Sequence, residues 1–259
     1  MTLHKTTPNA GTTTPLTALH GWGFNRAVWD ELGNQLKTDY RFDAIDLPGF
    51  GQSPMPAGEY TLAALADSVV ESLPSPSVLM GWSLGGMVAL EAARRYPERI
   101  DALVMVASAP RFTEAWDWPH GVASDVLENF SKTVIEDPRS ALSRFLILQA
   151  GQTDLGRATV KKLKPLLFRH GLPDRKALGA GLALLRETDL RPMLGAIRCP
   201  ILFILGARDN LLSPSVEMDL RRLRPDCRVA VIAGAHAPFI SHPTEFLGAL
   251  NPFLQDIHR

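Results

Sequence analysis

The chain has 259 residues, of which 46% are hydrophobic and 21% are charged. These values are typical of a globular protein, and the length is enough to bury one large core. Because 27 Lys and Arg residues balance 27 Asp and Glu residues, the chain has no net charge that would favour a nucleic acid or an anionic membrane as a partner.

The opening stretch MTLHKTTPNAGTTT is polar and lacks the apolar core of a signal peptide. No later apolar run reaches the roughly 18 residues that a transmembrane helix needs. We therefore expect a cytoplasmic protein, and we expect a monomer. Cys199 and Cys227 belong to no CxxC motif or His/Cys cluster, so no metal or other cofactor is expected.

Short apolar runs alternate with helical patterns, which predicts a mostly parallel sheet with helices on both faces. The expected strands lie in the runs LTALHG (16–21), FDAIDLPG (42–49), SVLMGWS (77–83), IDALVMVAS (100–108), PILFILGARD (200–209) and RVAVIAGAH (228–236). Helices are expected over 62–73 with Thr61 as the N-cap, over 84–96, and over 215–223 with Pro214 at the first helical position.

The alternation stops over residues 111–192, where several helical patterns occur without a convincing strand. These patterns cover 122–134, 138–149 and 156–168. We expect an α/β core built from residues 1–110 and 193–259, with residues 111–192 inserted as a helical cap. Such a cap would cover the carboxyl ends of the strands, where open α/β folds bind their ligands.

The segment Gly81-Trp82-Ser83-Leu84-Gly85 matches the pattern GxSxG. The apolar run SVLM leads into it and the helical run LGGMVALEAARRY follows, which is typical of the nucleophile elbow of α/β-hydrolases. The serine of such an elbow lies in a strained turn where neighbouring side chains would collide, so glycines are required beside it. We expect Ser83 to be a nucleophile.

A serine hydroxyl needs a base, and in α/β-hydrolases an acid and then a histidine follow the serine along the chain. His236 follows the last expected strand, and Asp209 ends the strand before it. We expect His236 to be the general base and Asp209 to orient it. The alternative for His236 is a loop histidine without a catalytic role, and the alternative for Asp209 is a turn aspartate beside Asn210. His242 precedes Pro243 and is interpreted as part of a helix cap.

The segment HGWG (20–23) ends the first expected strand, and a loop in this place donates a backbone N–H to a developing oxyanion. We assign the two oxyanion donors to the N–H groups of Trp22 and Leu84. His20 precedes Ser83 in the chain, so we expect it to brace the loop by hydrogen bonding. Asp46, at the next junction of strand and loop, is expected to hold its turn.

The motifs HGWG, DLPGFGQS, GWSLGG, GARD and AHAPFISHP, in this order, make the chain similar to α/β-hydrolases of the carboxylesterase kind. Within that group, HGWG, Trp82 in the elbow, Arg144-Phe145-Leu146 with Gln149, and HAPFISHP resemble the pimeloyl-acyl carrier protein methyl ester esterases of biotin synthesis. The resemblance implies hydrolysis of the methyl ester on pimeloyl-acyl carrier protein, releasing methanol and a free carboxylate. It also implies that Phe145 and Gln149 line an acyl channel together with Trp22 and Leu84.

Basic residues of the cap contact the acidic carrier protein in that family. Arg144 and Arg157 carry over as arginines, while Lys161 keeps the charge but not the bidentate geometry of an arginine. Independently of the resemblance, residues 139–176 contain nine basic residues and two acidic ones. Arg157, Lys161 and Lys164 would share one helix face. The simpler interpretation is a solvated face, and the functional one is a docking patch for the carrier protein.

Several alternatives use the same features. A general short-acyl esterase, a thioesterase or a lactonase would need the same three catalytic residues, and a perhydrolase is a weaker option. Dehalogenases and many epoxide hydrolases of this fold need an aspartate nucleophile, which Ser83 does not provide. The alternative outside catalysis is a ligand-binding module built on a hydrolase fold, in which members of the triad can be missing.

Overall fold

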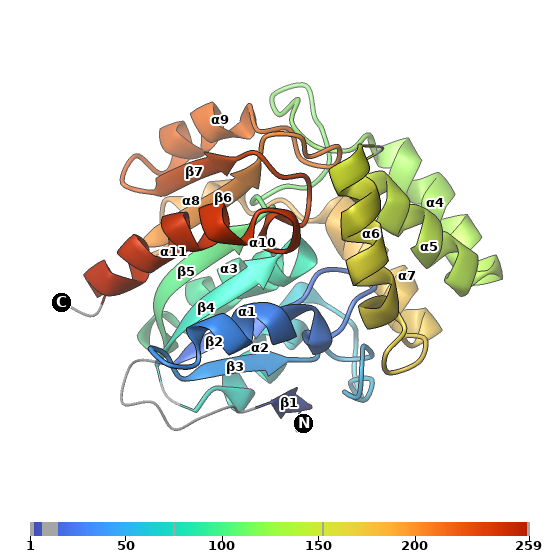
Figure 1. Cartoon of the computed structure of the whole chain (residues 1–259), viewed down its shortest axis with the longest axis horizontal. Helices are drawn as coiled ribbons and strands as arrows, with labels where there is room; N and C mark the ends of the chain where they lie inside the picture. Colours follow the sequence, from blue (N-terminus) through green and yellow to red (C-terminus); the bar gives the residue numbers. More distant parts are fainter. Residues whose placement is uncertain (1–2, 7–14, 75, 152, 258–259) are drawn as a thin grey trace.

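A seven-stranded sheet forms the centre of the computed structural model, which describes residues 3–6, 15–74, 76–151 and 153–257 (Figure 1). Its strand order is β1-β3-β2-β4-β5-β6-β7. The strands are β1 (Lys5–Thr6), β2 (Leu16–Leu19), β3 (Phe42–Ile45), β4 (Ser77–Trp82), β5 (Ile100–Val106), β6 (Ile201–Gly206) and β7 (Arg228–Ile232). All neighbouring pairs from β3 to β7 are parallel, which confirms the predicted fold and its six strands.

The first strand was not predicted. β1 pairs antiparallel with β3, so that Lys5 lies opposite Ile45. A two-residue strand in a polar stretch has no alternating pattern, and its pairing partner is about forty residues away, so no local signal marks it. The antiparallel strand adds an edge to a sheet that is otherwise fully parallel.

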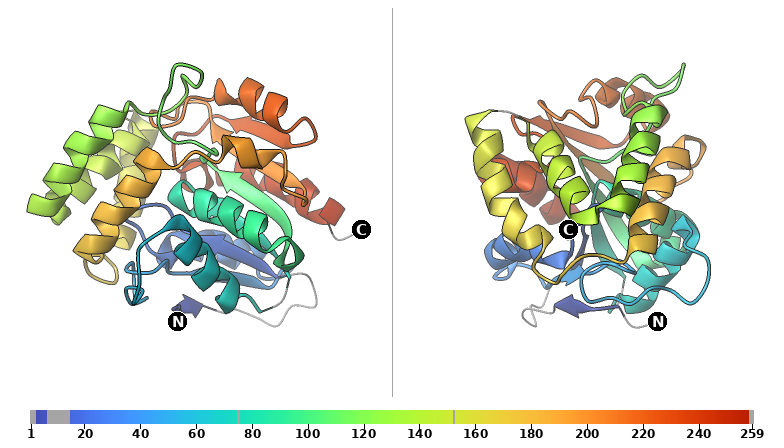
Figure 2. Two further views of the ribbon diagram at one scale, coloured as in Figure 1. Left: turned by 180° about the vertical axis from the view of Figure 1, so that it is seen from behind. Right: turned by 90° about the vertical axis from the view of Figure 1, so that its right-hand side faces the viewer.

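Helices cover both faces of the sheet, as a parallel sheet requires. α1 and α11 lie on one face (Figure 1), and α2 and α3 lie on the other (Figure 2). The helices of this part are η1 (Arg26–Trp29), α1 (Asp30–Leu36), α2 (Leu62–Ser72), α3 (Leu84–Arg95), η2 (Pro97–Arg99), α8 (Arg191–Leu194), α9 (Val216–Leu223), α10 (Pro238–Ser241) and α11 (Pro243–Ile257). Every residue of β2, β3, β4 and β6 is buried between the two layers.

The predicted start of α2 agrees with the structure, and the predicted start of α9 does not. Thr61 caps α2 by accepting a hydrogen bond from the Ala64 N–H at 3.1 Å, as its sequence position predicts. The prediction that Pro214 occupies the first position of the next helix is wrong, because α9 begins at Val216. The Val216 N–H bonds to the carbonyl of Ser213 at 3.1 Å, so this stretch is a tight turn that precedes the helix.

Of the helices described between β5 and β6, all but the short α8 lie beyond the carboxyl ends of the strands (Figures 1 and 2). They are α4 (Ser124–Glu136), α5 (Pro138–Ala150), α6 (Asp154–Leu167) and α7 (Arg175–Glu187). α4 starts two residues later than the pattern predicts, because the Val122 N–H bonds to the Phe112 carbonyl at 3.0 Å. No helix within the described ranges is long and apolar enough to cross a bilayer.

The two chain segments that connect these four helices to the sheet lie side by side. The Arg111 guanidinium bonds to the Asp189 carboxylate at 3.0 Å, and Arg191 bonds to the same carboxylate at 2.7 Å. Partial burial alone would raise the pKa of Asp189, but the hydrogen bonds from Arg191 and Arg111 outweigh it and lower that pKa. One network of ion pairs therefore joins the two connecting segments to each other.

Candidate active site

Ser83 stands between β4 and α3 in a strained backbone conformation. Its φ is 53° and its ψ is −117°, a region that residues with a side chain rarely occupy. The Ser83 N–H bonds to the Val106 carbonyl at 3.0 Å, and the Ser83 carbonyl accepts the Ser108 hydroxyl at 2.8 Å. β5 and the residues after it thus hold the turn that the GxSxG pattern predicts.

The two glycines of the motif are required by close backbone approaches. A Cβ atom on Gly81 would lie 2.3 Å from the Gly85 carbonyl oxygen, and a Cβ atom on Gly85 would lie 2.6 Å from the carbonyl oxygens of Leu19 and His20. Both distances are far inside van der Waals contact. These glycines let the elbow close on itself and let the loop after β2 approach it.

Asp209 and His236 meet at the carboxyl ends of β6 and β7. The His236 Nδ1 atom lies 2.7 Å from the Asp209 Oδ2 atom, and both side chains are 1% exposed. The other carboxylate oxygen accepts the N–H groups of Leu211 and Leu212 at 2.8 and 3.1 Å. Asp209 therefore holds its own turn and contacts the His236 ring at the same time, so a turn aspartate and an aspartate paired with His236 are compatible interpretations.

The backbone of His236 is held by two other parts of the chain. Its N–H bonds to the Gln149 carbonyl in α5 at 3.3 Å, and its carbonyl accepts the indole N–H of Trp82 at 2.6 Å. The second ring nitrogen, Nε2, is buried and makes no hydrogen bond to any described residue. The Ser83 hydroxyl and this nitrogen are not hydrogen-bonded to each other in the described structure. A buried ring nitrogen without a hydrogen-bond partner is available to accept a proton from a nucleophile.

The loop after β2 lies directly against the elbow. A Cβ atom on Gly21 would lie 3.3 Å from the Ser83 Cβ atom. Within the part of the chain that the structure describes, the N–H groups of Trp22 and Leu84 donate no backbone hydrogen bond. Both amides are therefore available beside Ser83, and two such donors could bind a developing negative charge.

His20 braces this loop, as expected. The Leu47 N–H donates to the His20 Nε2 atom at 3.0 Å, so the proton must sit on Nδ1, which lies 2.8 Å from the Gly21 carbonyl. Burial lowers the pKa of His20 despite the opposing charge of Asp46, which favours this neutral form. His20 thus joins the loops after β2 and β3.

Asp46 holds the loop after β3 from inside. One carboxylate oxygen accepts the Arg26 N–H at 2.7 Å, and the other accepts the Gln52 N–H at 3.0 Å. The Arg26 guanidinium, which also lies 3.2 Å from His170 in the loop after α6, completes an ion pair with Asp46 at 3.1 Å. The structural role expected for Asp46 matches this geometry.

Aromatic side chains of the loop after β2 and of the inserted helices form one cluster. The rings of Trp22 and Phe145 are 5.1 Å apart, and Phe130 of α4 lies 5.6 and 5.5 Å from them. The Trp22 indole N–H also bonds to the Leu178 carbonyl of α7 at 2.9 Å. Phe130 was not identified from the sequence, because an isolated aromatic residue on an amphipathic helix has no distinguishing pattern.

The buried side chain of Gln149 lies in the same region. Gln149 is 1% exposed, and its Nε2 atom makes no hydrogen bond to any described residue. A Cβ atom on Gly181 of α7 would lie 2.8 Å from the Trp22 ring and 3.5 Å from Leu84. The structure therefore brings Trp22 and Leu84 together under α7, with Phe145 beside Trp22 and Gln149 bound to the backbone of His236.

Arg144, Arg157 and Lys161 are exposed on the packed pair of helices α5 and α6. Arg157 forms an ion pair with Asp154 one turn before it. A groove of about 430 Å³ is lined by Ile147 of α5 and by Arg157 of α6. The three basic residues named from the sequence thus come from the two helices that border one apolar groove.

Comparison with known proteins adds three findings. Residues 14–243 match the family described as alpha/beta hydrolase fold. The chain is similar to the pimeloyl-acyl-carrier protein methyl ester esterase of Edwardsiella ictaluri, with 42% identity over 92% of each chain, and to that of Pectobacterium carotovorum, with 38% identity over 98% and 99%. An esterase from Exiguobacterium antarcticum has the same fold, with a TM-score of 0.86 and 22% identity over 98% of this chain and 95% of that chain.

The close approach at Gly85 leads to a stability prediction. Gly85→Ala should lower the free energy of unfolding by about 1–3 kcal/mol, the usual cost of overpacking a rigid core. The control is Gly248→Ala in α11, where a Cβ atom would meet nothing within 4 Å; helix propensity predicts a gain of up to ~1 kcal/mol there. Urea unfolding followed by circular dichroism measures both. Equal stability of the two variants would contradict the packing assigned to the elbow.

Proposed function

The chain belongs to the α/β-hydrolase family and, within it, to the pimeloyl-acyl-carrier protein methyl ester esterases, and we propose that it hydrolyses the methyl ester of a pimeloyl chain carried on acyl carrier protein. The products are methanol and pimeloyl-acyl carrier protein, a step of biotin synthesis. The observation that carries the chemistry is the buried Asp209–His236 pair, at 2.7 Å, with its free Nε2 atom at the same sheet edge as Ser83.

In the first half of the proposed reaction, the Ser83 oxygen attacks the ester carbonyl carbon while its proton passes to the Nε2 atom of His236. The carbonyl oxygen becomes an oxyanion, which the N–H groups of Trp22 and Leu84 bind. Asp209 stabilises the positive imidazolium that forms. His236 then gives the proton to the methoxy oxygen as the carbon–oxygen bond breaks, so that methanol leaves and the acyl chain stays on Ser83.

In the second half, a water molecule takes the place of methanol. His236 accepts a proton from the water as its oxygen attacks the acyl carbon, and the same two amides bind the second oxyanion. The proton returns to the Ser83 oxygen as the acyl–enzyme bond breaks. The free carboxylate leaves, and Ser83 and His236 are restored to their starting states.

The aromatic cluster supports an acyl substrate. Trp22, Phe130 and Phe145 pack ring to ring where the inserted helices meet the loop after β2. Apolar rings of this kind can bury the methylenes of an acyl chain, at about 0.8 kcal/mol for each one. We propose that residues 111–192 act as a cap whose inner side binds the pimeloyl chain, with Gln149 beside its ester end.

The exposed basic residues support a carrier protein as the source of that chain. Arg157 lines a groove between α5 and α6, and Arg144 and Lys161 are exposed on the same two helices, where an acidic partner would meet positive charge. Two basic residues of this segment are not part of the proposed docking surface, because Lys162 and Arg169 form ion pairs with Glu31 and Asp30 of α1. A cytoplasmic location and a monomeric state stay predictions.

The proposed nucleophile has a direct test. Ser83→Ala should lower methanol release from the methyl ester by about 10³-fold or more while leaving the free energy of unfolding nearly unchanged, because it removes only a hydroxyl. Ser68→Ala is a matched control, since the Ser68 hydroxyl bonds only to the Ala64 carbonyl within α2, at 2.9 Å. Stopped assays of methanol measure both variants. Wild-type turnover by Ser83→Ala would rule out the mechanism.

The carrier-docking surface has a separate test. Reversing the charges of Arg144, Arg157 and Lys161 to Glu should raise KM for the carrier-bound ester by about tenfold or more, with turnover of a small free ester unchanged. Rising salt should weaken carrier-bound turnover by the wild type, since exposed charges are screened within about 10 Å at 0.1 M.

The control for this test reverses three exposed charges elsewhere, at Lys5, Lys37 and Arg198. It makes the same change in net charge, so an effect of overall charge would appear in both triple variants. If the two variants have the same KM for the carrier-bound ester, the basic residues of α5 and α6 are a solvated face, and the carrier-docking proposal fails.

A further inference from the structure

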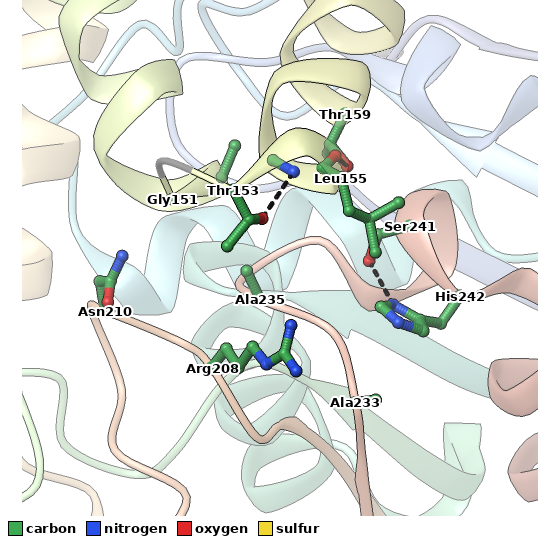
Figure 3. Close-up of a pocket in the computed structure, with 12 residues that line it drawn as sticks. Gly151, Thr153, Leu155, Thr159, Arg208, Asn210, Ala233, Ala235, Ser241 and His242 are labelled. Carbon is green, nitrogen blue, oxygen red and sulfur yellow. Dashed lines mark hydrogen bonds between the residues drawn. The ribbon is translucent and has the colours of Figure 1, made fainter.

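A cavity lies against the loops that carry Asp209 and His236, where Arg208, Asn210 and Ala235 line it (Figure 3). Its volume is about 160 Å³, and three parts of the chain line it. These are the end of α5 with the first two turns of α6, the residues that follow β6, and the residues from the end of β7 to the end of α10. The proposed reaction makes no use of this cavity.

Arg208 supplies an uncompensated positive charge to the cavity. Its guanidinium extends toward the space between Ala235 and Ser241 (Figure 3). Within the described ranges, the Arg208 side chain makes no hydrogen bond and no ion pair. Arg208 is thus an exposed residue that lines the cavity with a guanidinium that has no partner among the described residues.

Further polar side chains line the same space, although the Ser241 hydroxyl already donates to the Ala237 carbonyl at 3.3 Å. His242 lies across the cavity from Arg208, and its Nδ1 atom is 2.9 Å from the Ser241 hydroxyl. The Thr153 hydroxyl accepts the Gly156 N–H at 3.0 Å, so its own proton can be donated elsewhere. The cavity therefore combines an arginine, a histidine and hydroxyl groups.

No acidic residue opposes these groups within the lining. None of the twelve residues that line the cavity is Asp or Glu. Two carboxylates lie nearby and already have partners: Asp154 pairs with Arg157, and Glu245 accepts the Ala233 N–H at 3.2 Å. The balance of charge in the lining favours an anion.

From these contacts we infer that the cavity binds a phosphate group. The planar guanidinium of Arg208 can donate two parallel hydrogen bonds to phosphate oxygens, which an ammonium group cannot do. The cavity volume of about 160 Å³ is far above the space that one water needs, so a phosphate with a small attached group fits. The site goes beyond the proposed esterase reaction and does not depend on it.

The position of the cavity connects a bound phosphate to the catalytic loops. Arg208 directly precedes Asp209, and the Arg208 N–H bonds to the Gly234 carbonyl at 2.9 Å. Ala235, which lines the cavity, directly precedes His236. A phosphate held here contacts α6 and both loops at once, so it stabilises their arrangement in the folded state.

Calorimetric titration of the full chain tests the site, with inorganic phosphate as the probe and sodium chloride of equal ionic strength as the blank. The wild type should bind one phosphate saturably. Arg208→Gln should weaken binding by about tenfold or more, because a charge-assisted hydrogen bond is lost, and Arg208→Lys should fall between the two. Arg175→Gln, which removes the charge of an exposed arginine outside the cavity, should leave the affinity unchanged.

Two further measurements separate the site from the ester reaction and identify its ligand. Ser83→Ala should bind phosphate as the wild type does, even if the esterase proposal fails. Glycerol phosphate binding more tightly than inorganic phosphate identifies a phosphate monoester as the ligand, and equal affinities identify free phosphate. The inference is overturned if the wild type shows no saturable binding above the chloride blank, or if Arg208→Gln and Arg175→Gln weaken binding equally.

Discussion

The site depends on one constraint, the forced turn at Ser83 between β4 and α3. A φ of 53° is unfavourable for a serine, so the surroundings must hold it. β5 does so through the Val106 carbonyl and the Ser108 hydroxyl. The turn places the hydroxyl at the start of α3 and next to the N–H of Leu84. Without it, the serine would continue the strand and its hydroxyl would lie within the sheet instead of at the start of α3.

The parallel sheet explains why distant parts of the chain meet at this turn. Strands that run in one direction end at one edge, so the loops after β2, β4, β6 and β7 converge there. The inserted helices then close the edge through backbone contacts: the Gln149 carbonyl accepts the His236 N–H, and the Leu178 carbonyl accepts the Trp22 indole. The helices thus position the proposed base and the loop after β2.

The sequence predicted the features that have a local pattern. The six parallel strands were found from their apolar runs, and the elbow was found from glycines that the structure shows to be sterically required. The roles of Phe130 and helix α7 depend on how the inserted helices pack, and the bond from Trp82 to His236 joins β4 to the loop after β7; no local pattern records either contact. Similarly, charge alone did not reveal that Lys162 and Arg169 pair with α1, because ion-pair partners are chosen by tertiary contacts.

The central claim is that the chain is an esterase whose methyl ester substrate arrives on a carrier protein. The most direct measurement compares kcat/KM for the methyl ester of pimeloyl-acyl carrier protein with kcat/KM for the same acyl methyl ester without the carrier. The account predicts methanol release from both and a value at least about tenfold higher for the carrier-bound ester, since charge complementarity promotes the encounter. Equal values, or no methanol from the carrier-bound ester, would contradict it.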